Sequence, residues 1–284
     1  MAKILEQTPI LAGVVGHPVS HSLSPIIHTI WAQRAGIDGY YIPIAVPPDY
    51  DDFARVMESL RNVGFAGVNV TIPHKEHALR YADIVSDAAR QAGAGNMLTF
   101  SEDGCLAENS DITGFAEAVR EKNSAPGTSA LVLGAGGAAR GVVLALKSLG
   151  VTDIRIANRT MDRAKDLAGV FDLAVMDWKK KSEAIDNIDL LVNTTSLGMS
   201  GQPPLEIDIS GLNPAAMVAD IVYAPLKTAL LEDAESKGHP IVDGLAMLMH
   251  QAVPGFKKWF GGDAQVDQAL RAALVSELER RAKT

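Results

Sequence analysis

From residue 129 onward, short apolar segments alternate with longer segments of helical periodicity, and this alternation limits the possible folds more than any other feature. The apolar segments are 129–133, 153–157, 172–176, 188–192, 217–222 and 240–242, with helical patterns between them at 137–149, 161–169, 226–237 and 245–260. Parallel strands that are buried on both faces form continuous apolar runs and need helical crossovers. The pattern predicts a doubly wound parallel sheet in an α/β protein.

The preceding part of the chain shows a looser form of the same alternation. Strand-like segments lie at 10–15, 40–44, 67–71, 96–100 and 105–108, and helical patterns lie at 25–35, 50–61, 74–92, 111–122 and, at the other end of the chain, 264–282. A chain of 284 residues is long enough for two hydrophobic cores. We therefore expect two α/β lobes.

Composition and charge exclude several classes of partner. The chain is 47% hydrophobic and 21% charged, as globular proteins are, and its net charge of −8 argues against a basic nucleic-acid surface. No apolar stretch has the length of about 18 residues that a membrane span needs, and the segment from Met1 to Leu11 does not resemble a signal peptide. With Cys105 as the single cysteine, the chain cannot form an internal disulfide, and we expect a cytoplasmic protein.

A glycine-rich turn joins the apolar run 129–133 to the helical pattern that follows it. Gly134, Gly136 and Ala139 form a GxGxxA sequence, in which residues without a Cβ let backbone N–H groups approach a pyrophosphate. The candidate cofactor-binding residues in this turn are Gly134, Ala135, Gly136, Gly137 and Ala138. A glycine-rich turn without a ligand is the alternative.

The next apolar run ends at Asn158-Arg159-Thr160, where a site for NAD usually presents a carboxylate to the ribose. Arg159, with Arg163 one helical turn further on, offers guanidinium groups that can bind a 2′-phosphate instead. The sequence therefore favours NADP over NAD, although NAD remains possible. In the alternative interpretation, Asn158 and Thr160 cap the next helix and Arg159 is simply solvated.

In the first lobe, polar residues cluster at positions that the packing of a hydrophobic core does not explain. Ser22 and Ser24 precede Pro25 at the start of a helical pattern, where two hydroxyls and a helix N-terminus can bind a small carboxylate. Capping of the helix by Ser24 is the simpler explanation. Asn69 and Thr71 alternate along an apolar strand ahead of Lys75. Asn96 ends the segment Gly93-Ala-Gly-Asn96, and Asp111 belongs to the segment Asn109-Ser-Asp111.

Simpler interpretations exist for these residues too, and the sequence supports neither a metal site nor a serine nucleophile. Lys75 alone resembles a solvated lysine, and Asp111 alone resembles a helix cap. The pairs His17/His21 and His74/His77 suggest a metal site, but no CxxC or HExxH pattern completes one, so we expect no metal. No GxSxG elbow supports a serine nucleophile.

Taken together, these segments resemble the shikimate dehydrogenase family over nearly the whole chain. The order and spacing of the motifs carry the likeness. They are Ser22-Leu-Ser24-Pro25, Asn69-Val-Thr71-Ile-Pro73-His-Lys75, Gly93-Ala-Gly-Asn96, Asn109-Ser-Asp111, Gly134-Ala-Gly-Gly-Ala138, Asn158-Arg-Thr160, Asn193-Thr-Thr-Ser196-Leu-Gly198-Met199, Asp220-Ile-Val-Tyr223-Ala-Pro225 and Gly244-Leu-Ala-Met247-Leu-Met-His-Gln251.

The resemblance implies a substrate-binding and catalytic domain at 1–115, joined by C-terminal helices at about 246–284, and a Rossmann-like NADP-binding domain at 116–245. It implies reversible, NADP-linked reduction of 3-dehydroshikimate to shikimate, a step in aromatic amino acid biosynthesis by the chorismate pathway, in a monomer or homodimer. It assigns Lys75 and Asp111 as the catalytic pair. Substrate would contact Ser22, Ser24, Asn69, Thr71, Asn96, Asp111, Tyr223 and Gln251, and the cofactor would also contact Thr195, Met199, Gly244 and Met247.

Four residues depart from the family pattern beside presumed ligand-binding positions. They are Thr29, Met97, Glu108 and Ser110, where the family usually has Asn, Thr, a smaller residue and Thr. They leave open a paralogue that acts on quinate, an amino-shikimate or another ring hydroxy acid, with NADP or NAD. A nucleotide-binding regulator that has lost turnover is a further alternative.

Overall fold

The computed structural model describes residues 8–283 and divides them into two compact units. The first contains the chain up to Ser110 together with Gln251–Leu274, and the second contains Asp111–His250 together with the segment from Val275 onward. Residues 1–7 and 284, which fall at the ends of the expected substrate domain, lie outside the described residues. The functional division at 1–115, 116–245 and 246–284 stays a prediction.

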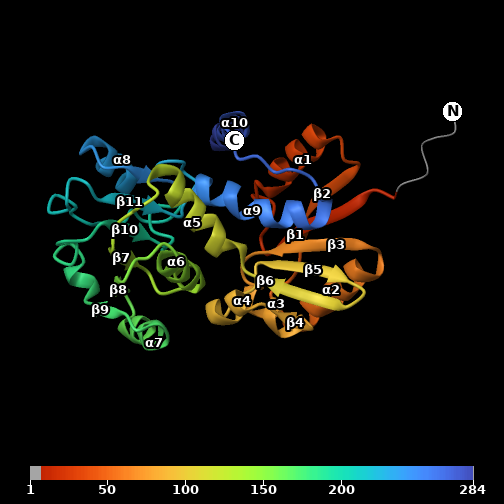
Figure 1. Cartoon of the computed structure of the whole chain (residues 1–284), viewed down its shortest axis with the longest axis horizontal. Coiled ribbons are helices and arrows are strands. Elements are labelled where there is room, and N and C mark those ends of the chain that lie inside the picture. Colours follow the sequence, from red (N-terminus) through yellow and green to blue (C-terminus); the bar gives the residue numbers. More distant parts are fainter. Residues whose placement is uncertain (1–7, 284) are drawn as a thin grey trace. The chain divides into compact units, whose positions relative to one another are not determined.

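A mixed sheet of six strands forms the centre of the first unit (Figure 1). Its order is β2-β1-β3-β5-β6-β4, and β5 runs antiparallel to both of its neighbours. The strands are β1 (Ile10–Gly16), β2 (Gly39–Ala45), β3 (Phe65–Val70), β4 (Ile84–Val85), β5 (Met97–Ser101) and β6 (Gly104–Glu108). The expected α/β architecture of the first lobe is confirmed.

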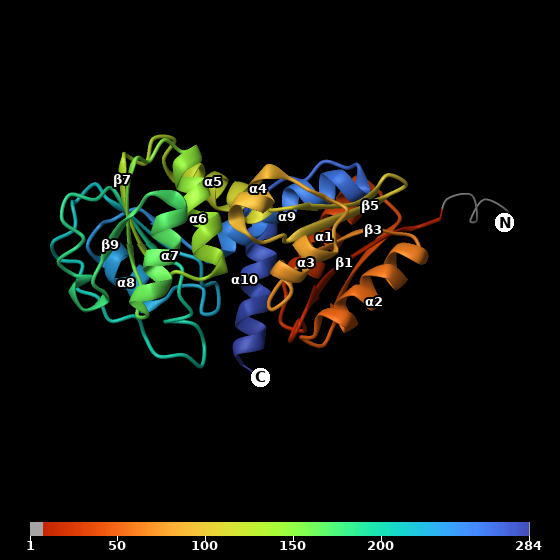
Figure 2. The same cartoon turned by 90° about the horizontal axis from the view of Figure 1, so that it is seen from below.

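The first unit also contains helices. They are α1 (Ser24–Ala35), α2 (Tyr50–Asn62), α3 (Lys75–Tyr81), α4 (Asp87–Ala92), the part of α9 (Gly244–Phe260) from Gln251 and the part of α10 (Gln268–Ala282) up to Leu274. Figure 2 shows α2 and α3 beside β1 and β3. Phe53 and Met57 of α2 are fully buried against Val15 and Val68 of this sheet. A helical spacing of apolar residues thus attaches α2 to the sheet.

The prediction of a single helix over residues 74–92 is wrong. The chain leaves the helical conformation at Ala82, forms the short strand β4 and begins α4 only after Ser86. The Ser86 hydroxyl accepts a hydrogen bond from the backbone N–H of Ala89, so it caps the second helix. That serine was the sequence signal for a break.

The second unit contains the parallel sheet that the alternation predicted. Its order is β12-β11-β10-β7-β8-β9, and every pair of neighbours is parallel. The strands are β7 (Ser129–Leu133), β8 (Asp153–Ala157), β9 (Ala174–Met176), β10 (Leu190–Asn193), β11 (Met217–Asp220) and β12 (Ile241–Val242). From β7 the chain adds β8 and β9 on one side, and it then adds β10, β11 and β12 on the other side of β7. The carboxyl ends of β7 and β10 therefore flank a topological switch point.

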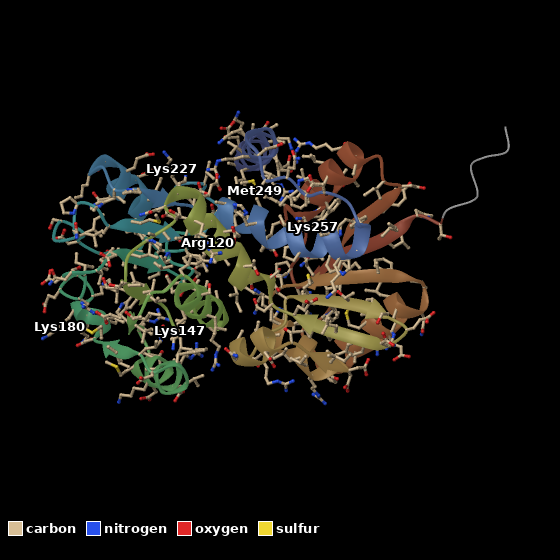
Figure 3. The ribbon with its side chains drawn as sticks, in the orientation of Figure 1. Arg120, Lys147, Lys180, Lys227, Met249 and Lys257 are labelled. Carbon is tan, nitrogen blue, oxygen red and sulfur yellow. The ribbon has the colours of Figure 1, made fainter. Side chains whose placement is uncertain are left out.

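Hydrophobic clusters lie on both faces of this sheet. One face packs against α5 (Ser110–Lys122), α6 (Gly137–Ser148) and α7 (Met161–Phe171). The other packs against residues 184–188, 205–212 and α8 (Ala229–Ser236), near a short 3-10 helix, η1 (Trp178–Lys180). Lys147, labelled in Figure 3, donates a 2.7 Å hydrogen bond from α6 to the carbonyl of Phe171 and so ties α6 to the end of α7. Among residues 8–283, no helix is long and apolar enough to cross a membrane.

Candidate active site

The glycine-rich turn of the second unit leaves open space in front of a helix N-terminus. Gly134 has a φ of +105°, and a Cβ there would lie 2.6 Å from Oγ1 of Thr194, so only glycine fits. Gly136 precedes α6, and a Cβ on Gly136 or Gly137 would meet no atom of the described residues within 4 Å. Exposed N–H groups at the start of a 12-residue helix suit a pyrophosphate. The turn therefore fits a dinucleotide.

The end of β8 presents cationic groups beside that turn. Oδ1 of Asn158 accepts a hydrogen bond from the N–H of Ala135, and its Nδ2 donates to the carbonyl of Thr160. Thr160 precedes α7, but its side chain makes no capping bond within the described part of the chain. Asn158 thus links two loops rather than capping a helix, and Arg159 and Arg163 are exposed. This edge suits a phosphorylated ribose.

A buried carboxylate organises the ends of β10 and β11. Asp220 is 1% exposed, and its oxygens accept hydrogen bonds from Asn193, Val222 and Thr228. Burial raises the pKa of Asp220, and these donors act in the opposite direction. Oδ1 of Asn193 in turn accepts from the backbone N–H and the hydroxyl of Thr195.

The segment after β11 carries Tyr223 and packs against the start of α9. A Cβ on Gly244 would lie 2.2 Å from the carbonyl oxygen of Ile221, so this approach requires glycine. Burial raises the pKa of Tyr223. Met199 is 40% exposed, and Met247 is half-buried. The second unit thus contains four of the residues expected to face the cofactor or the ring, namely Met199, Tyr223, Gly244 and Met247.

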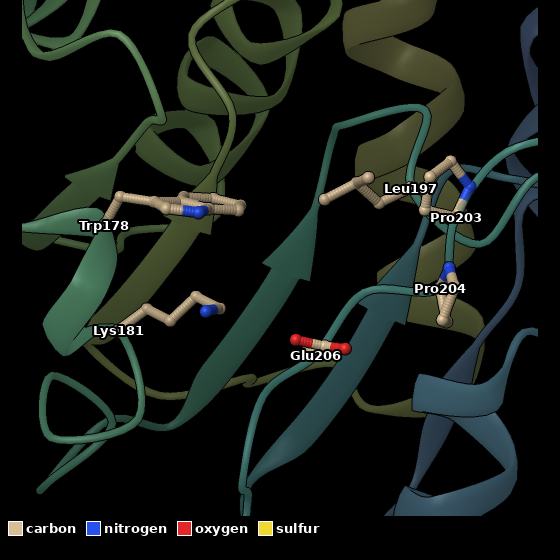
Figure 4. Close-up of a pocket in the computed structure, with 6 residues that line it drawn as sticks. All are labelled: Trp178, Lys181, Leu197, Pro203, Pro204 and Glu206. Atoms are coloured by element: carbon tan, nitrogen blue, oxygen red, sulfur yellow. The ribbon is translucent and has the colours of Figure 1, made fainter.

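A pocket of about 250 Å³ lies on one side of the β10 end (Figure 4). Trp178 and Lys181 border it from the region of η1, and they face Leu197, Pro203, Pro204 and Glu206 across the opening. The Lys181 ammonium lies 5.0 Å from the centre of the Trp178 ring. None of these residues was predicted as a site residue, because Leu197 stands in a motif without an assigned role and the other five stand in no motif.

In the first unit, buried amides form a continuous hydrogen-bonded chain. Nδ2 of Asn69 donates a hydrogen bond to the backbone carbonyl of Asn96 (3.2 Å). The side-chain Oδ1 of Asn96 accepts a hydrogen bond from the backbone N–H of Ser110 (2.6 Å). The Ser110 hydroxyl accepts from Nδ2 of Asn96 (3.1 Å) and donates to Oε1 of Gln251 (3.5 Å). All four residues are at most 7% exposed. Buried amides that hold one another in place present fixed donors and acceptors.

Tyr41 joins this chain to the serine motif. Its hydroxyl donates to Oδ1 of Asn69 (2.7 Å) and is hydrogen-bonded to the side chain of Ser24. The capping interpretation of Ser24 is wrong: α1 begins at Ser24, and the cap residue is Leu23, whose side chain makes no capping bond. Oγ of Ser22 accepts instead from the Ser24 N–H at 3.3 Å. The Ser24 hydroxyl is thus available to the buried polar chain.

Lys75 is the first residue of α3. Hydrogen bonds and ring packing hold its backbone and the preceding residue, His74, in place. The Lys75 carbonyl accepts from the N–H of Gly95, and the ring of His74 is fully buried against Phe53. His74 is hydrogen-bonded through Nε2 to the Val46 carbonyl and through Nδ1 to Nδ1 of His77. Thr71, at the end of β3, is half-buried. No cluster of three or more metal-ligating side chains occurs among the described residues.

Asp111 lies in the first turn of α5, one residue after the start of that helix, so it is not the helix cap. The residue before it, Ser110, is anchored to Asn96 as described above. Lys75 belongs to the first unit and Asp111 to the second, and their pairing stays a prediction.

The four departures from the family pattern occupy different environments. Met97 is 2% exposed, and Thr29 lies on the surface. The carboxylate of Glu108 pairs with the ammonium of Lys258 at 2.6 Å. Ser110 contacts the amide chain through its side chain, and it retains a hydroxyl there. Ser110 therefore keeps a hydroxyl in the amide chain, whereas Met97 places a buried apolar side chain where the family usually has a threonine.

Sequence reasoning missed Tyr41 and His28. The imidazole of His28 stacks on the Tyr41 ring at 3.9 Å, and neither of its ring nitrogens has a hydrogen-bond partner among residues 8–283. Complete burial lowers the pKa of His28 to about 3. A buried tyrosine hydroxyl requires a polar partner, so Tyr41 becomes a candidate once its burial is known. No motif in the sequence marked it.

Two family models match consecutive parts of the chain. The substrate binding domain of shikimate dehydrogenase matches residues 14–98, and a domain described as shikimate / quinate 5-dehydrogenase matches residues 116–199. A protein from Dinoroseobacter shibae, named shikimate dehydrogenase (NADP(+)), is 48% identical over 275 residues, which cover 94% of this chain and 98% of the relative. The chain belongs to the shikimate dehydrogenase family.

Solved structures agree with this membership. A shikimate 5-dehydrogenase from Thermus thermophilus, in complex with NADP(H) and shikimate, has a TM-score of 0.84 at 34% identity and covers 96% of this chain and 99% of its own. A quinate dehydrogenase from Corynebacterium glutamicum, in complex with NAD, has a TM-score of 0.87 at 30% identity and covers 94% of this chain and 99% of its own. The expected Rossmann-like domain and two-domain α/β fold of the family are confirmed.

Proposed function

We propose that this member of the shikimate dehydrogenase family catalyses the reversible, NADP-dependent reduction of 3-dehydroshikimate to shikimate. The observation that carries the proposal is the buried chain of Asn69, Asn96, Ser110 and Gln251. Each amide offers both a donor and an acceptor, as neighbouring hydroxyls on a ring require. The relative from Dinoroseobacter shibae, which is named shikimate dehydrogenase (NADP(+)), supports the same assignment.

We propose that ring hydroxyls bind Asn69, Thr71, Asn96, Asp111 and Gln251, and that the ring carboxylate binds Ser22 and Ser24. Ser24 suits this role because it begins α1, where the helix dipole favours an anion. Tyr223 would complete the contacts to the substrate. The altered residue Ser110 touches the amide chain with a hydroxyl, as the usual threonine would. Relatives at 48 to 49% identity that are named shikimate dehydrogenase (NADP(+)) favour shikimate over quinate or an amino analogue.

The cofactor would be held by the glycine turn, the end of β8 and the loop after β10. Gly134 to Ala138 would bind the pyrophosphate, Asn158 to Thr160 and Arg163 would bind the 2′-phosphorylated ribose, and Thr195, Met199, Gly244 and Met247 would lie along the remainder. Open space at Gly136 and Gly137 and exposed guanidinium groups support this assignment. When bound, NADPH supplies the hydride.

Lys75 and Asp111 would act on the ring carbonyl as the catalytic pair. Negative charge develops on the carbonyl oxygen as it is reduced, and an ammonium group stabilises that charge and can donate the proton. The carboxylate of Asp111 would orient both the amine and a ring hydroxyl, so that part of its contribution is geometric. In the oxidation direction, the same amine would receive the hydroxyl proton.

A panel of ring acids and cofactors tests the proposal. Initial rates should show the highest kcat/KM for shikimate with NADP, with lower values for quinate and for NAD. A higher kcat/KM for quinate than for shikimate would replace the proposal with the quinate assignment. Binding of NADP without oxidation of any ring acid would favour a regulator that has lost turnover.

We also propose that the protein acts in the cytoplasm as a monomer or homodimer on a small ring acid. The single cysteine, Cys105, is buried, and burial raises the pKa of its thiol to about 12. Such a thiol is inert toward disulfide exchange. Light scattering on a size-exclusion column distinguishes the two oligomeric states.

A further inference from the structure

One buried carboxylate in the second unit contacts three segments of the chain. Oδ1 of Asp220 accepts hydrogen bonds from Nδ2 of Asn193 and from the N–H of Val222, both at 3.0 Å. Its Oδ2 accepts from the hydroxyl of Thr228 at 2.7 Å. Burying a carboxylate is costly without such donors, so the three segments are held where they can supply them.

The first segment is the loop after β10, which carries Thr195 and Met199. Because Asp220 is an acceptor, it fixes which end of the Asn193 amide points toward it. The opposite end, Oδ1, then accepts from the N–H and the hydroxyl of Thr195, at 3.0 and 2.7 Å. Nδ2 also donates to the carbonyl of Leu197 at 3.2 Å. The orientation of the Asn193 side-chain amide therefore determines the backbone positions of Thr195 and Leu197 in this loop.

The second segment is the one after β11, which carries Tyr223. The N–H of Val222 bonds to Asp220, and the N–H of Ile221 donates to the Asn193 carbonyl at 3.1 Å. The N–H of Ser200, from the first loop, donates to the carbonyl of Ala224 at 2.8 Å. The two loops are thus bonded to each other as well as to Asp220.

The third segment is the start of α8. Thr228 caps this helix, since its hydroxyl oxygen accepts from the N–H of Leu231 while its proton is donated to Asp220. A Cβ on Gly198 would lie 3.3 Å from the Thr228 side chain, so the first loop also packs on this residue. The carboxylate accordingly stands where both loops and the helix meet.

We propose that Asp220 is a positioning residue that sets the loop of Thr195 and Met199 and the segment of Tyr223 at the same time. The inference rests on the proposed function for the roles of those three residues. Removing the carboxylate should weaken cofactor binding and ring-acid binding together, because both segments depend on it. A residue that only supports the fold would lower stability and leave both binding constants of the folded enzyme unchanged.

The test compares Asp220→Asn with a matched control, Asp189→Asn. Asp189 precedes β10 at the opposite end of the sheet, and its carboxylate also accepts three hydrogen bonds, from the N–H groups of Thr128 and Ser129 and from the Ser129 hydroxyl. The Kd for NADPH is measured by its fluorescence, the KM for shikimate by initial rates, and stability by thermal unfolding of each full-length protein. We expect Asp220→Asn to raise the Kd and the KM about tenfold each, the effect of one lost charged hydrogen bond. Asp189→Asn should lower only the Tm.

Loss of stability without a change in either constant for Asp220→Asn, as in the control, would overturn the proposal. If Asp220→Asn does not fold, Thr228→Val and Thr228→Ser provide the same comparison. Valine removes the hydroxyl bonded to Asp220 and should raise both constants, and serine should restore them. Equal constants for the valine and serine variants would also contradict the proposal.

A double variant tests the route through Asn193. If Asp220 acts on the loop through this amide, Asn193→Ala and Asp220→Asn together should raise the Kd for NADPH no more than the larger single effect. Additive effects would contradict this route. Failure of the proposed function is a separate result: the unmodified enzyme would then not oxidise shikimate, while the Kd for NADPH would still report on Asp220.

Discussion

The phenolic hydroxyl of Tyr41 donates a 2.7 Å hydrogen bond to Oδ1 of Asn69, and both side chains are at most 5% exposed. That bond leaves Nδ2 of Asn69 directed to the Asn96 carbonyl. A residue on the edge strand β2 thereby fixes the orientation of an amide on β3.

Tyr41→Phe should therefore impair ring-acid binding more than turnover. The phenylalanine keeps the stacking on His28 but leaves Oδ1 of Asn69 without this donor. A lost buried hydrogen bond of about 1.4 kcal/mol corresponds to a tenfold rise in the KM for shikimate. Initial-rate kinetics give the KM and kcat, and the KM for NADP serves as the internal control. Unchanged KM values for both ligands would show that Asn69 does not need Tyr41.

Glycine substitutions separate the fold from the cofactor site. Gly136→Ala should leave the Tm close to that of the unmodified protein, because a Cβ there meets no atom of the described chain within 4 Å. It should nevertheless weaken NADPH binding, since the methyl group would occupy the space in front of α6. Gly134→Ala should instead lower the Tm, because its φ is +105° and Thr194 lies 2.6 Å from the added carbon. Normal NADPH affinity in Gly136→Ala would contradict the assigned pyrophosphate site.

Arg159→Ala should weaken NADP binding far more than NAD binding. A guanidinium bonded to a dianionic phosphate contributes about 2 to 3 kcal/mol, so the KM for NADP should rise by roughly 30-fold or more. The KM for NAD should change little. Arg120→Ala, which removes an exposed arginine paired with Glu117, is the control. An equal rise in the KM for NADP and the KM for NAD in Arg159→Ala would contradict the assignment of Arg159 to the 2′-phosphate.

The buried imidazole of His28 should make the protein sensitive to acid. Burial lowers its pKa from 6.5 to about 3, so between these values the unfolded chain binds a proton that the folded chain excludes. Stability contributed by the neutral ring is complete above pH 6.5 and falls by up to about 1.4 kcal/mol per unit as the pH decreases toward 3.

Thermal unfolding across this pH range checks that expectation. His28→Phe should have a shallower acid slope than the unmodified protein, and His21→Gln, which alters an exposed histidine, should keep the original slope. Identical slopes in all three proteins would show that another group dominates acid unfolding.

The sequence predicted the strands of the second unit well because the central strands β7, β10 and β11 are buried on both faces and form continuous apolar runs. The sequence did not reveal β4 and α4, since two short elements share one continuous helical pattern and only Ser86 marks the break. The simpler interpretation that Ser24 and Asp111 cap helices was wrong, because Ser24 is the first residue of α1 and Asp111 is the second residue of α5. Capping residues resemble residues of the first turn in composition, so spacing alone does not separate them.

Motif residues of the site were selected from the sequence, but their supporting contacts were not. Asn193 and Asp220 stood in matched motifs without an assigned role, because their hydrogen bond joins residues 27 positions apart. Tyr41 had no motif at all, and it contacts Asn69 across 28 positions. Such contacts depend on strand order, which the apolar pattern leaves open.

The most direct test of the central claim, that Lys75 and Asp111 act together on the ring acid, is the kcat for shikimate oxidation in the variants Lys75→Ala, Asp111→Ala and the double variant. Each single substitution should lower kcat by roughly 10² or more, as loss of a catalytic acid or base does. The double variant should be little slower than the slower single variant, because the residues work as a unit. Full turnover in Lys75→Ala, or a double effect equal to the product of the single effects, would contradict the account.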